Sequence, residues 1–328
     1  MTTSEILDGF KKLKALVVGD ICLDRWCTYD PATSEPSRET GIPRMGVVST
    51  EVTPGGGGTV ANNLAALGTG EVATLGIRGD DGFGFELVRA LNERGITTSL
   101  MVDIRRWQTF TYTKLLNGET GIEDLPRVDF ISTKPLPKEA EKRVIDNLVS
   151  AIEGFDVVLV ADQAETAAGG VVTPAVRESI MELARKHAGK VFLVDSRKRV
   201  HLFREVIVKP NRAEAEAACE QLFGHTDFKR LREHLGGRAV VVTHGPQGAL
   251  VVEEGKETWA KARTVEKPVD ICGAGDSFAA GTALTMVVTG DPVAAASFGN
   301  LVASITIMKK GTGTASPEEV REASTQGL

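Results

Sequence analysis

The chain has 328 residues, of which 42% are apolar and 25% charged, with 35 glycines. These values are ordinary for a globular protein, and the length suits one large α/β domain or two small ones. The net charge of −6, without any long run of Lys or Arg, argues against a nucleic-acid or membrane partner but leaves a small anionic substrate open.

The cysteines and the first residues indicate the cellular compartment. Cys22, Cys27, Cys219 and Cys272 show no spacing typical of a metal site, so we expect reduced thiols. Residues 1–14 are polar and mixed in charge, unlike a signal peptide. No apolar stretch approaches the ~20 residues that span a bilayer. The sequence therefore predicts a cytoplasmic protein.

Short runs rich in Val, Ile and Leu alternate with amphipathic segments along the chain. The predicted buried strands are Ala15–Asp20, Val72–Gly76, Asp156–Asp162, Val191–Asp195, Glu205–Val208 and Ala239–Thr243. Continuous apolar runs of this kind are typical of a parallel sheet covered on both faces. The helices between them have clear start signals, namely Thr173-Pro174, Asp291-Pro292 and the capping box that begins at Ser316. We expect a doubly wound α/β fold.

Two regions interrupt this alternation. Asp24–Thr53 and Thr109–Phe130 carry alternating patterns such as TFTYTKLL and RVDFIST, with a turn signal at Asn117-Gly118. They are typical of antiparallel strands exposed on one face. Neither is long enough to form its own core. We therefore expect a single domain over residues 1–328, with a small β-sheet lid formed by two insertions at about 24–53 and 109–130.

The strongest chemical signal is the turn Gly273-Ala274-Gly275-Asp276, which precedes the helical run Ser277–Val288. Small residues let the backbone approach a ligand, and a helix N-terminus directs N–H groups and partial positive charge at it. The turn therefore predicts an anion hole for phosphate oxygens. An Asp in a first helical turn is also what capping alone would select, but this turn holds more glycine than a cap requires.

A second glycine-rich turn, Gly55 to Gly58, precedes another predicted helix. Consecutive glycines suit close approach of the backbone to a ligand, although a flexible loop would look the same. No GxxxxGK[ST] motif is present, which excludes a P-loop NTPase. The absence of GxGxxG after the first strand argues against dinucleotide binding.

The order of these motifs resembles the ribokinase, or PfkB, family of sugar kinases over nearly the whole chain. The matching motifs are the Val17–Asp20 strand leading to Asp24, Gly55–Gly58, the NxxE motif Asn211–Glu214, the turn Thr243–Gly248, Gly273–Asp276 and Asn300. Within the family, VGDICLDRW, PGGGGTVANNLAALG, GTGTASPEE and TYTKLL…RVDF are most similar to heptose-phosphate kinases. Those kinases are often fused to a nucleotidyltransferase, whose HxGH-type motif is not found here, so we expect the kinase module alone.

This resemblance implies a role for each matching position. Asp276 would be the catalytic base, and the amides of Gly273, Ala274 and Gly275 would hold the transferred phosphoryl group. The sugar would be bound by Asp24, Gly55, Gly56, Thr59, Asn63, Lys114 and Asp162. ATP would be bound by Thr243, Gly245, Gly248 and Asn300, with Asn211 and Glu214 organising Mg²⁺ through its waters. Asp270, with carbonyls near Gly311 and Ser316, would hold a monovalent cation such as K⁺.

Simpler interpretations of the same residues stay open at this point. Asn211 and Glu214 also suit a helix cap, and Thr243–Gly248 suits a plain turn. Asn300, Lys114 and Arg127 also suit solvated positions.

The sequence departs from the heptose-phosphate kinases on the substrate side. Thr59 stands where those relatives carry Asn, Arg197 replaces a Lys, and Asp162-Gln163 is followed by AETAA instead of a Tyr and a Lys-containing turn. We therefore predict an ATP-dependent kinase acting on a hydroxyl of a sugar or sugar phosphate, with heptose 7-phosphate as the leading specific acceptor. The alternative is a catalytically silent sugar- or nucleotide-binding regulator on the same fold. Relatives often pair through their lids, so we expect a homodimer.

Overall fold

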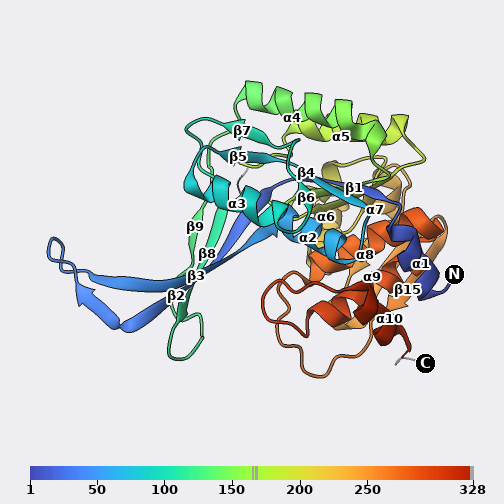
Figure 1. Ribbon diagram of the computed structural model, residues 1–328. Coiled ribbons are helices and arrows are strands. Elements are labelled where there is room, and N and C mark those ends of the chain that lie inside the picture. Colours follow the sequence, from blue (N-terminus) through green and yellow to red (C-terminus); the bar gives the residue numbers. More distant parts are fainter. Residues whose placement is uncertain (165, 167–168, 326–328) are drawn as a thin grey trace.

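The computed structural model describes residues 1–164, 166 and 169–325, and its centre is a nine-stranded sheet (Figure 1). The strand order is β15-β14-β13-β12-β11-β10-β1-β4-β6. The parallel strands are β1 (Lys14–Gly19), β4 (Glu71–Leu75), β6 (Ile96–Thr97), β10 (Val157–Asp162), β11 (Val191–Ser196), β12 (Ile207–Val208) and β13 (Val240–Thr243). An antiparallel edge hairpin follows, formed by β14 (Gly248–Glu253) and β15 (Lys256–Lys261). The predicted α/β fold with a mostly parallel sheet is confirmed.

Helices cover both faces of this sheet because successive strand residues point to opposite sides. In β1, Val17 packs into one hydrophobic cluster and Leu16 into the other. The first cluster includes α1 (Thr3–Phe10), α2 (Gly57–Ala66), α3 (Gly82–Asn92), α8 (Ala274–Thr289), α9 (Pro292–Thr306) and α10 (Pro317–Thr325). The second includes α4 (Lys138–Ala151), α5 (Pro174–Lys186), α6 (Arg212–Phe223) and α7 (Phe228–His234). A short parallel pair, β5 (Ile77–Gly79) and β7 (Val102–Ile104), lies beside α4.

Local hydrogen bonds account for where several helices begin. The Thr173 side chain accepts the Val176 N–H at the start of α5, with Pro174 in the first turn. Ser316 and Glu319 form the predicted capping box before α10, with bonds of 3.2 and 2.8 Å. These predicted helix starts are confirmed.

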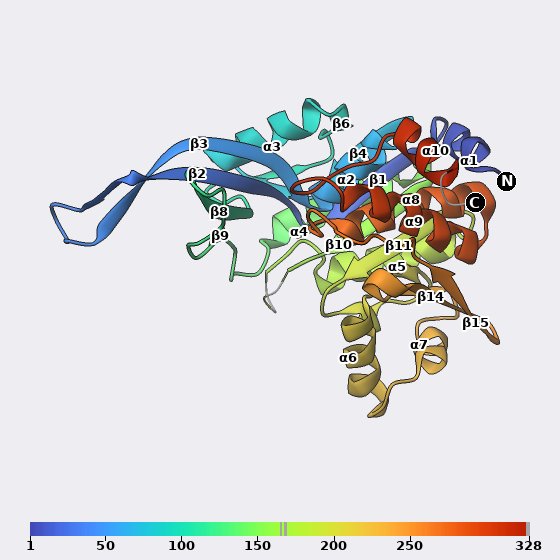
Figure 2. The same ribbon diagram turned by 90° about the horizontal axis from the view of Figure 1, so that it is seen from below.

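A second sheet of order β3-β2-β8-β9 extends from the body (Figures 1 and 2). Its strands are β2 (Ile21–Pro36), β3 (Pro43–Gly56), β8 (Thr111–Asn117) and β9 (Val128–Phe130). The two predicted insertions supply these strands, but β2 and β8 pair in parallel, whereas the pattern had predicted antiparallel strands. The reason is that β2 and β8 come from different insertions, so no hairpin turn sets their direction. Beyond Tyr29, β2 and β3 continue as a two-stranded ribbon.

Within the described ranges, with 165, 167–168 and 326–328 excepted, no helix is both long and apolar enough to cross a bilayer.

Candidate active site

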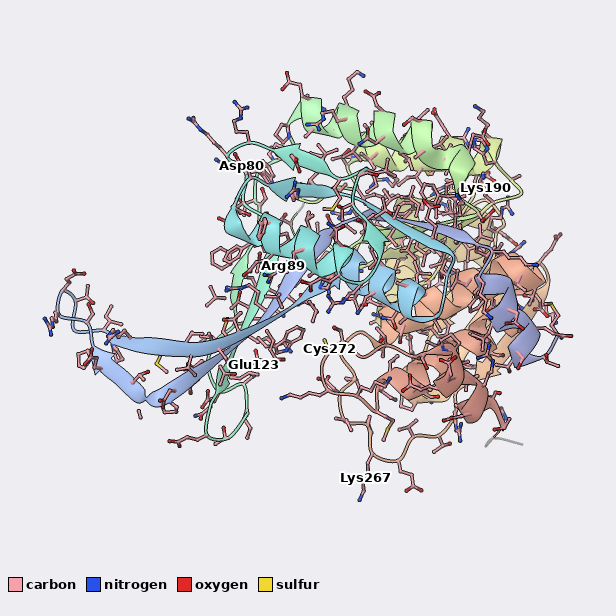
Figure 3. The ribbon with its side chains drawn as sticks, viewed as in Figure 1. Asp80, Arg89, Glu123, Lys190, Lys267 and Cys272 are labelled. Carbon is pink, nitrogen blue, oxygen red and sulfur yellow. The ribbon has the colours of Figure 1, made fainter. Side chains whose placement is uncertain are left out.

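Two cavities lie on either side of the turn that begins α8, and one of them is also lined by residues of the second sheet. The first, which we call the acceptor-side cavity, has a volume of about 190 Å³. Its lining includes Asp24, Thr59, Lys114, Arg127, Arg197 and Asp276. Cys272, which also lines it, lies between the second sheet and the helices of the carboxyl-terminal part (Figure 3). Four of the lining side chains are cations, because Arg25 joins Lys114, Arg127 and Arg197.

The second cavity, the nucleotide-side cavity, has a volume of about 390 Å³ and a more apolar wall. Its lining includes Thr243, Gly245, Ala274, Gly275, Phe278 and Asn300. Gly273 and Asp276 line the acceptor-side cavity, whereas Ala274 and Gly275 line the nucleotide-side cavity. The glycine-rich turn at the start of α8 therefore stands between the two cavities.

The turn at the start of α8 requires glycine at its first position. Gly273 has a φ of 76°, and an added Cβ would lie 3.3 Å from a methyl carbon of Thr59 and of Thr312. This is the left-handed region that favours glycine. The Ala274 N–H donates to Ile271 O at 3.2 Å within the turn. Of the three amides predicted to hold the phosphoryl group, that of Ala274 therefore already donates a hydrogen bond within the protein.

Asp276 lies in the first turn of α8 and is partly buried. Burial of its carboxyl raises its pKa to about 7, and the carboxylates of Asp195 and Asp24 act in the same direction. Lys209 and Arg197 oppose that rise. A carboxyl with a pKa near neutrality is suited to accept a proton from a hydroxyl and to release it again.

Asp24 faces the same cavity from β2. Burial raises the pKa of Asp24 to about 6, while Lys114 and Arg127 on the second sheet oppose the rise. Gly55 pairs across the strands with Cys22, and a Cβ added at Gly55 would lie 2.2 Å from Asp24 Oδ1. The Asp24 carboxylate therefore lies directly against the Gly55 backbone, and only glycine leaves room for it.

Gly56 has a φ of 55°, and an added Cβ would lie 2.7 Å from Asp20 O. The glycine-rich turn is thus a packed turn rather than a flexible loop. Thr59 is buried, and its hydroxyl donates to Pro54 O at 3.2 Å. That bond orients the Thr59 side chain at the wall of the acceptor-side cavity.

On the phosphate side the structure groups a lysine with carboxylates. Lys209 is buried and forms a 3.0 Å ion pair with Asp195. Burial alone would lower the pKa of Lys209, but Asp195, Glu214 and Asp276 raise it above its usual value. Lys209 therefore stays charged, and its Nζ would lie 3.8 Å from a Cβ added at Gly275. The sequence prediction missed Lys209, although a Lys that ends a buried strand just before Asn211 was a usable signal.

Asn211 and Glu214 form a capping box at the start of α6. Asn211 N–H donates to Glu214 Oε2 at 2.8 Å, and Glu214 N–H donates to Asn211 Oδ1 at 2.9 Å. The capping interpretation of this pair is thus realised. Burial raises the pKa of Glu214, and Asp195 raises it further. Two carboxylates therefore stand together next to Lys209.

On the nucleotide side, the loop from Thr243 to Gly248 depends on two glycines with positive φ. Gly248 has a φ of 100°, and a Cβ there would lie 2.2 Å from Ala260 O. Gly245 also has a positive φ, of 56°. Asn300 is buried and donates from Nδ2 to Ala260 O at 2.8 Å, so it is not a solvated surface residue. Thr243 forms an isolated β-bridge with Asn211, which places the end of β13 beside the start of α6.

Three predicted sugar-side residues, Gly55, Asn63 and Asp162, are not among the residues that line the acceptor-side cavity. Asp162 is buried, and its two carboxylate oxygens accept bonds from Arg199 and from the Ser196 hydroxyl. Asn63 is buried in α2 and donates to Thr59 O at 2.9 Å. Both side chains are thus directed to neighbours inside the protein. Part of the departing AETAA segment, residues 165, 167 and 168, lies outside the described residues.

Asp20 is a further residue that sequence reasoning did not assign. Its Oδ2 accepts the N–H groups of Gln163 and Ala164 at 2.8 and 2.9 Å, and its Oδ1 accepts that of Val171 at 2.7 Å. Its carbonyl accepts the Gly57 N–H at 2.9 Å. Asp20 thus ties the loop after β10 to the glycine-rich turn. Gln163 lines the acceptor-side cavity, so this anchor lies behind the acceptor site.

Asp270 connects two loops beside the α8 turn. Its Oδ1 accepts the Cys272 N–H at 2.9 Å, and its Oδ2 accepts the Gly311 N–H at 3.1 Å. The carboxylate stands near the loop in which the predicted cation ligands lie, although each oxygen already accepts one bond.

The comparisons with known proteins agree with this geometry. The model of the pfkB family carbohydrate kinases matches residues 13–319. The bifunctional protein HldE of Pelobacter propionicus is 30% identical over 329 residues, covering 97% of this chain and 64% of that protein. This chain thus spans less than two thirds of that relative.

Two solved structures are similar in fold. Ribokinase from Thermotoga maritima has a TM-score of 0.70 at 21% identity, covering 95% of this chain and 99% of that one. Phosphofructokinase-2 from Escherichia coli in complex with potassium has a TM-score of 0.70 at 18% identity, covering 96% and 98%.

The fold is ribokinase-like. The chain belongs to the pfkB family of carbohydrate kinases.

Proposed function

We propose that the protein transfers the γ-phosphoryl group of ATP to a hydroxyl of a sugar or sugar phosphate, with Asp276 as the base. The observation that carries this proposal is the position of the Gly273–Asp276 turn between two cavities. A hydroxyl bound on one side and a triphosphate bound on the other would meet at the N-terminus of α8, where N–H groups and the helix dipole favour developing negative charge.

Each side of the turn contributes its own chemistry. Asp24 takes hydrogen bonds from acceptor hydroxyls, and Asp276 accepts the proton from the attacking one. Lys209 is charged and close to Gly275, and it draws the transferred group toward the turn. Gly245, Thr243 and Asn300 shape the wall against which the nucleotide lies.

The residues also fit the ions that such a transfer uses. Mg²⁺ prefers oxygen ligands and keeps several waters, and the neighbouring carboxylates of Glu214 and Asp195 would organise that water shell. When bound, Mg²⁺ would supply neutralising charge at the phosphates. A monovalent cation would lie near Asp270, a proposal supported by the loops this residue connects and by the potassium in the similar phosphofructokinase-2.

For the acceptor, we propose a sugar phosphate, with heptose 7-phosphate as the first compound to test. The similarity to HldE and the four cations around the acceptor-side cavity support an anionic acceptor.

The second sheet would act as a lid that excludes water during transfer. We also propose a homodimer through this sheet. In support, β3 is an edge strand, and Ile42, Val47 and Val48 on the ribbon are exposed. Four free cysteines and the use of ATP support a cytoplasmic location.

The test is ADP release by the purified protein over a panel of sugars and sugar phosphates that includes heptose 7-phosphate. We expect sugar-dependent turnover that is lost in Asp276→Asn prepared identically, which controls for contaminating host kinases. Sugar and ATP binding without turnover would instead support the silent regulator. Turnover that Asp276→Asn leaves unchanged would refute the proposed mechanism.

A further inference from the structure

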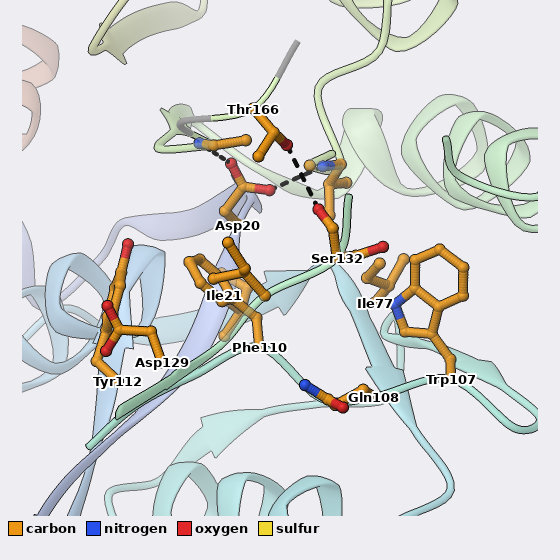
Figure 4. Close-up of a pocket in the computed structure, with 14 residues that line it drawn as sticks. Asp20, Ile21, Ile77, Trp107, Gln108, Phe110, Tyr112, Asp129, Ser132 and Thr166 are labelled. Atoms are coloured by element: carbon orange, nitrogen blue, oxygen red, sulfur yellow. Dashed lines mark hydrogen bonds between the residues drawn. The ribbon is translucent and has the colours of Figure 1, made fainter. Parts of the chain in front are cut away.

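A further cavity lies under the same face of the second sheet, farther from α8. This distal cavity has a volume of about 90 Å³ (Figure 4). Carbon atoms dominate its wall, to which Ile21, Ile77, Trp107, Phe110, Tyr112 and Val171 contribute. Nothing in the proposed transfer of a phosphoryl group to a simple sugar uses it.

The distal cavity adjoins the acceptor-side cavity. Tyr112 lines both, and it pairs directly with Asp24 across β8 and β2. Gln163 lines the acceptor-side cavity, whereas the next residue, Ala164, lines the distal one. The two cavities therefore meet at Tyr112, and a substituent on a sugar bound at Asp24 would enter the distal cavity on this side.

The chemistry of the distal wall excludes an anion. Among its described lining residues there is no Lys or Arg, in contrast to the four cations of the acceptor-side cavity. Its charged residues are Asp20 and Asp129. A phosphate placed here would lose its hydration and face two carboxylates, which is strongly unfavourable in a site of low polarity. The occupant is therefore not an anion, and the carbon-lined wall favours an uncharged group over a cation.

The carboxylates of Asp20 and Asp129 differ in the hydrogen bonds that they accept. Asp20 already accepts three backbone N–H groups. Asp129 binds Arg127 through Oδ2, but its buried Oδ1 has no hydrogen-bond partner in the part of the chain that the structure describes. A buried acceptor without a donor is destabilising, because it has lost its hydrogen bonds to water without replacing them. A ligand that brings an N–H or O–H to Asp129 would relieve that cost.

The volume limits the size of the occupant. An apolar cavity of ~150 Å³ binds a benzene ring. At about 90 Å³ the distal cavity takes a smaller group, of two or three carbon atoms, rather than an aromatic base. A short acylamino group meets each requirement, since it is uncharged, ends in a methyl carbon and carries an N–H donor.

We propose that the acceptor is an acylamino sugar whose acyl group enters the distal cavity while its N–H is directed to Asp129. This inference rests on the proposed kinase function and names an acceptor class other than heptose 7-phosphate. A phosphate on the same sugar would still meet Lys114 and Arg127 in the acceptor-side cavity, so the proposal holds for a free or a phosphorylated acylamino sugar.

The first experiment compares matched acceptors that differ only at the substituent. Glucose, mannose and galactose are each paired with their N-acetylamino counterparts, with and without a 6-phosphate, and heptose 7-phosphate is added as the reference. We expect one acetylated compound to exceed its parent sugar and heptose 7-phosphate by at least ~10-fold in kcat/KM, from one buried hydrogen bond and a buried methyl group.

The second experiment tests whether the preference for the acetylated compound arises in the distal cavity. Ile131→Trp fills it from a residue that is 45% exposed, so the larger side chain is tolerated. Val128→Trp is the matched control, because Val128 is 47% exposed in the adjoining strand and lines neither cavity. We expect Ile131→Trp to abolish the preference for the acetylated compound and Val128→Trp to keep it. Asp129→Ala should lower the ratio of kcat/KM for the acetylated compound to that for its parent sugar by ~10-fold, a ratio in which any effect through Arg127 on both compounds cancels.

The outcomes separate the two proposals. Turnover of parent sugars or heptose 7-phosphate without a gain from acetylation overturns the acylamino inference and leaves the kinase function intact. A preference that survives in Ile131→Trp also overturns it. Lack of turnover on the whole panel refutes the proposed function, and this inference falls with it.

Discussion

Replacing Gly55 by Ala tests the acceptor site without touching a reactive group. The backbone at Gly55 has no positive φ, so alanine itself introduces no conformational strain. Its Cβ would however lie 2.2 Å from Oδ1, 2.4 Å from Cγ and 2.7 Å from Oδ2 of Asp24. These distances are far inside van der Waals contact, so the Asp24 carboxylate must move out of its position.

The expected loss follows from the bonds that Asp24 would no longer make. A hydrogen bond to a charged group contributes ~1.5–3 kcal/mol, so kcat/KM for the acceptor should fall ~10- to 150-fold. ATP affinity should stay within ~3-fold, because Gly55 lies on the acceptor side. Steady-state rates with varied acceptor, and calorimetry with a non-hydrolysable ATP analogue, measure the two quantities.

The control is Gly82→Ala, at the start of α3, where an added Cβ meets nothing within 4 Å. A double-mutant cycle sharpens the test, since Gly55→Ala should cost little more once Asp24 is already Ala. The reasoning is refuted if Gly55→Ala keeps kcat/KM within ~3-fold of the unsubstituted protein, or if its loss persists in the Asp24→Ala background.

Three other substitutions address the rest of the site. Asp276→Asn should lower kcat ~10²–10⁴-fold, and a residual rate above a tenth would show that Asp276 is not the base. Because only the ionised carboxylate accepts a proton, the rate of the unsubstituted enzyme should fall as pH drops below about 7, and a rate that stays level into the acid range contradicts this role. Glu214→Gln should raise the Mg²⁺ concentration needed for half-maximal rate, whereas an unchanged Mg²⁺ dependence would leave Glu214 as a helix cap. Asp20→Asn should raise the acceptor KM ~10-fold with the ATP KM unchanged, from one lost charged hydrogen bond. Asp156→Asn, at the opposite end of the sheet, where Asp156 accepts the Lys14 N–H, should leave both KM values unaltered.

Sequence patterns predicted the body of the fold well because its determinants are local. Apolar runs of four to six residues gave the parallel strands, and the cap at Thr173 gave a helix start. The parallel pairing of β2 with β8 could not be seen in this way. It joins Leu23 to Thr111 across two separate insertions, and no short-range pattern carries that register.

Site residues could be predicted from the sequence where the backbone conformation or a close contact requires glycine. The roles of buried carboxylates could not, because their partners come from distant parts of the chain. Gly55, Gly248 and Gly273 are set by steric limits that a sequence motif records directly. Asp162 and Asp20 look alike in the sequence, each ending a buried strand. Only the fold reveals that Asp162 pairs with Arg199 and that Asp20 holds three backbone N–H groups.

The long β2–β3 ribbon has a mechanical consequence for the acceptor site. Asp24 and Gly55 sit at its root, and the strands run on to Pro36 and Pro43. Twelve further residues at ~3.3 Å each make a lever arm of about 40 Å. Its register shift between Asp30 and Glu35 lies beyond the segment from Leu23 to Tyr29 that β8 braces. We expect a load on the tip to bend the ribbon at this irregular joint, while the braced root keeps Asp24 in register with the glycine-rich turn.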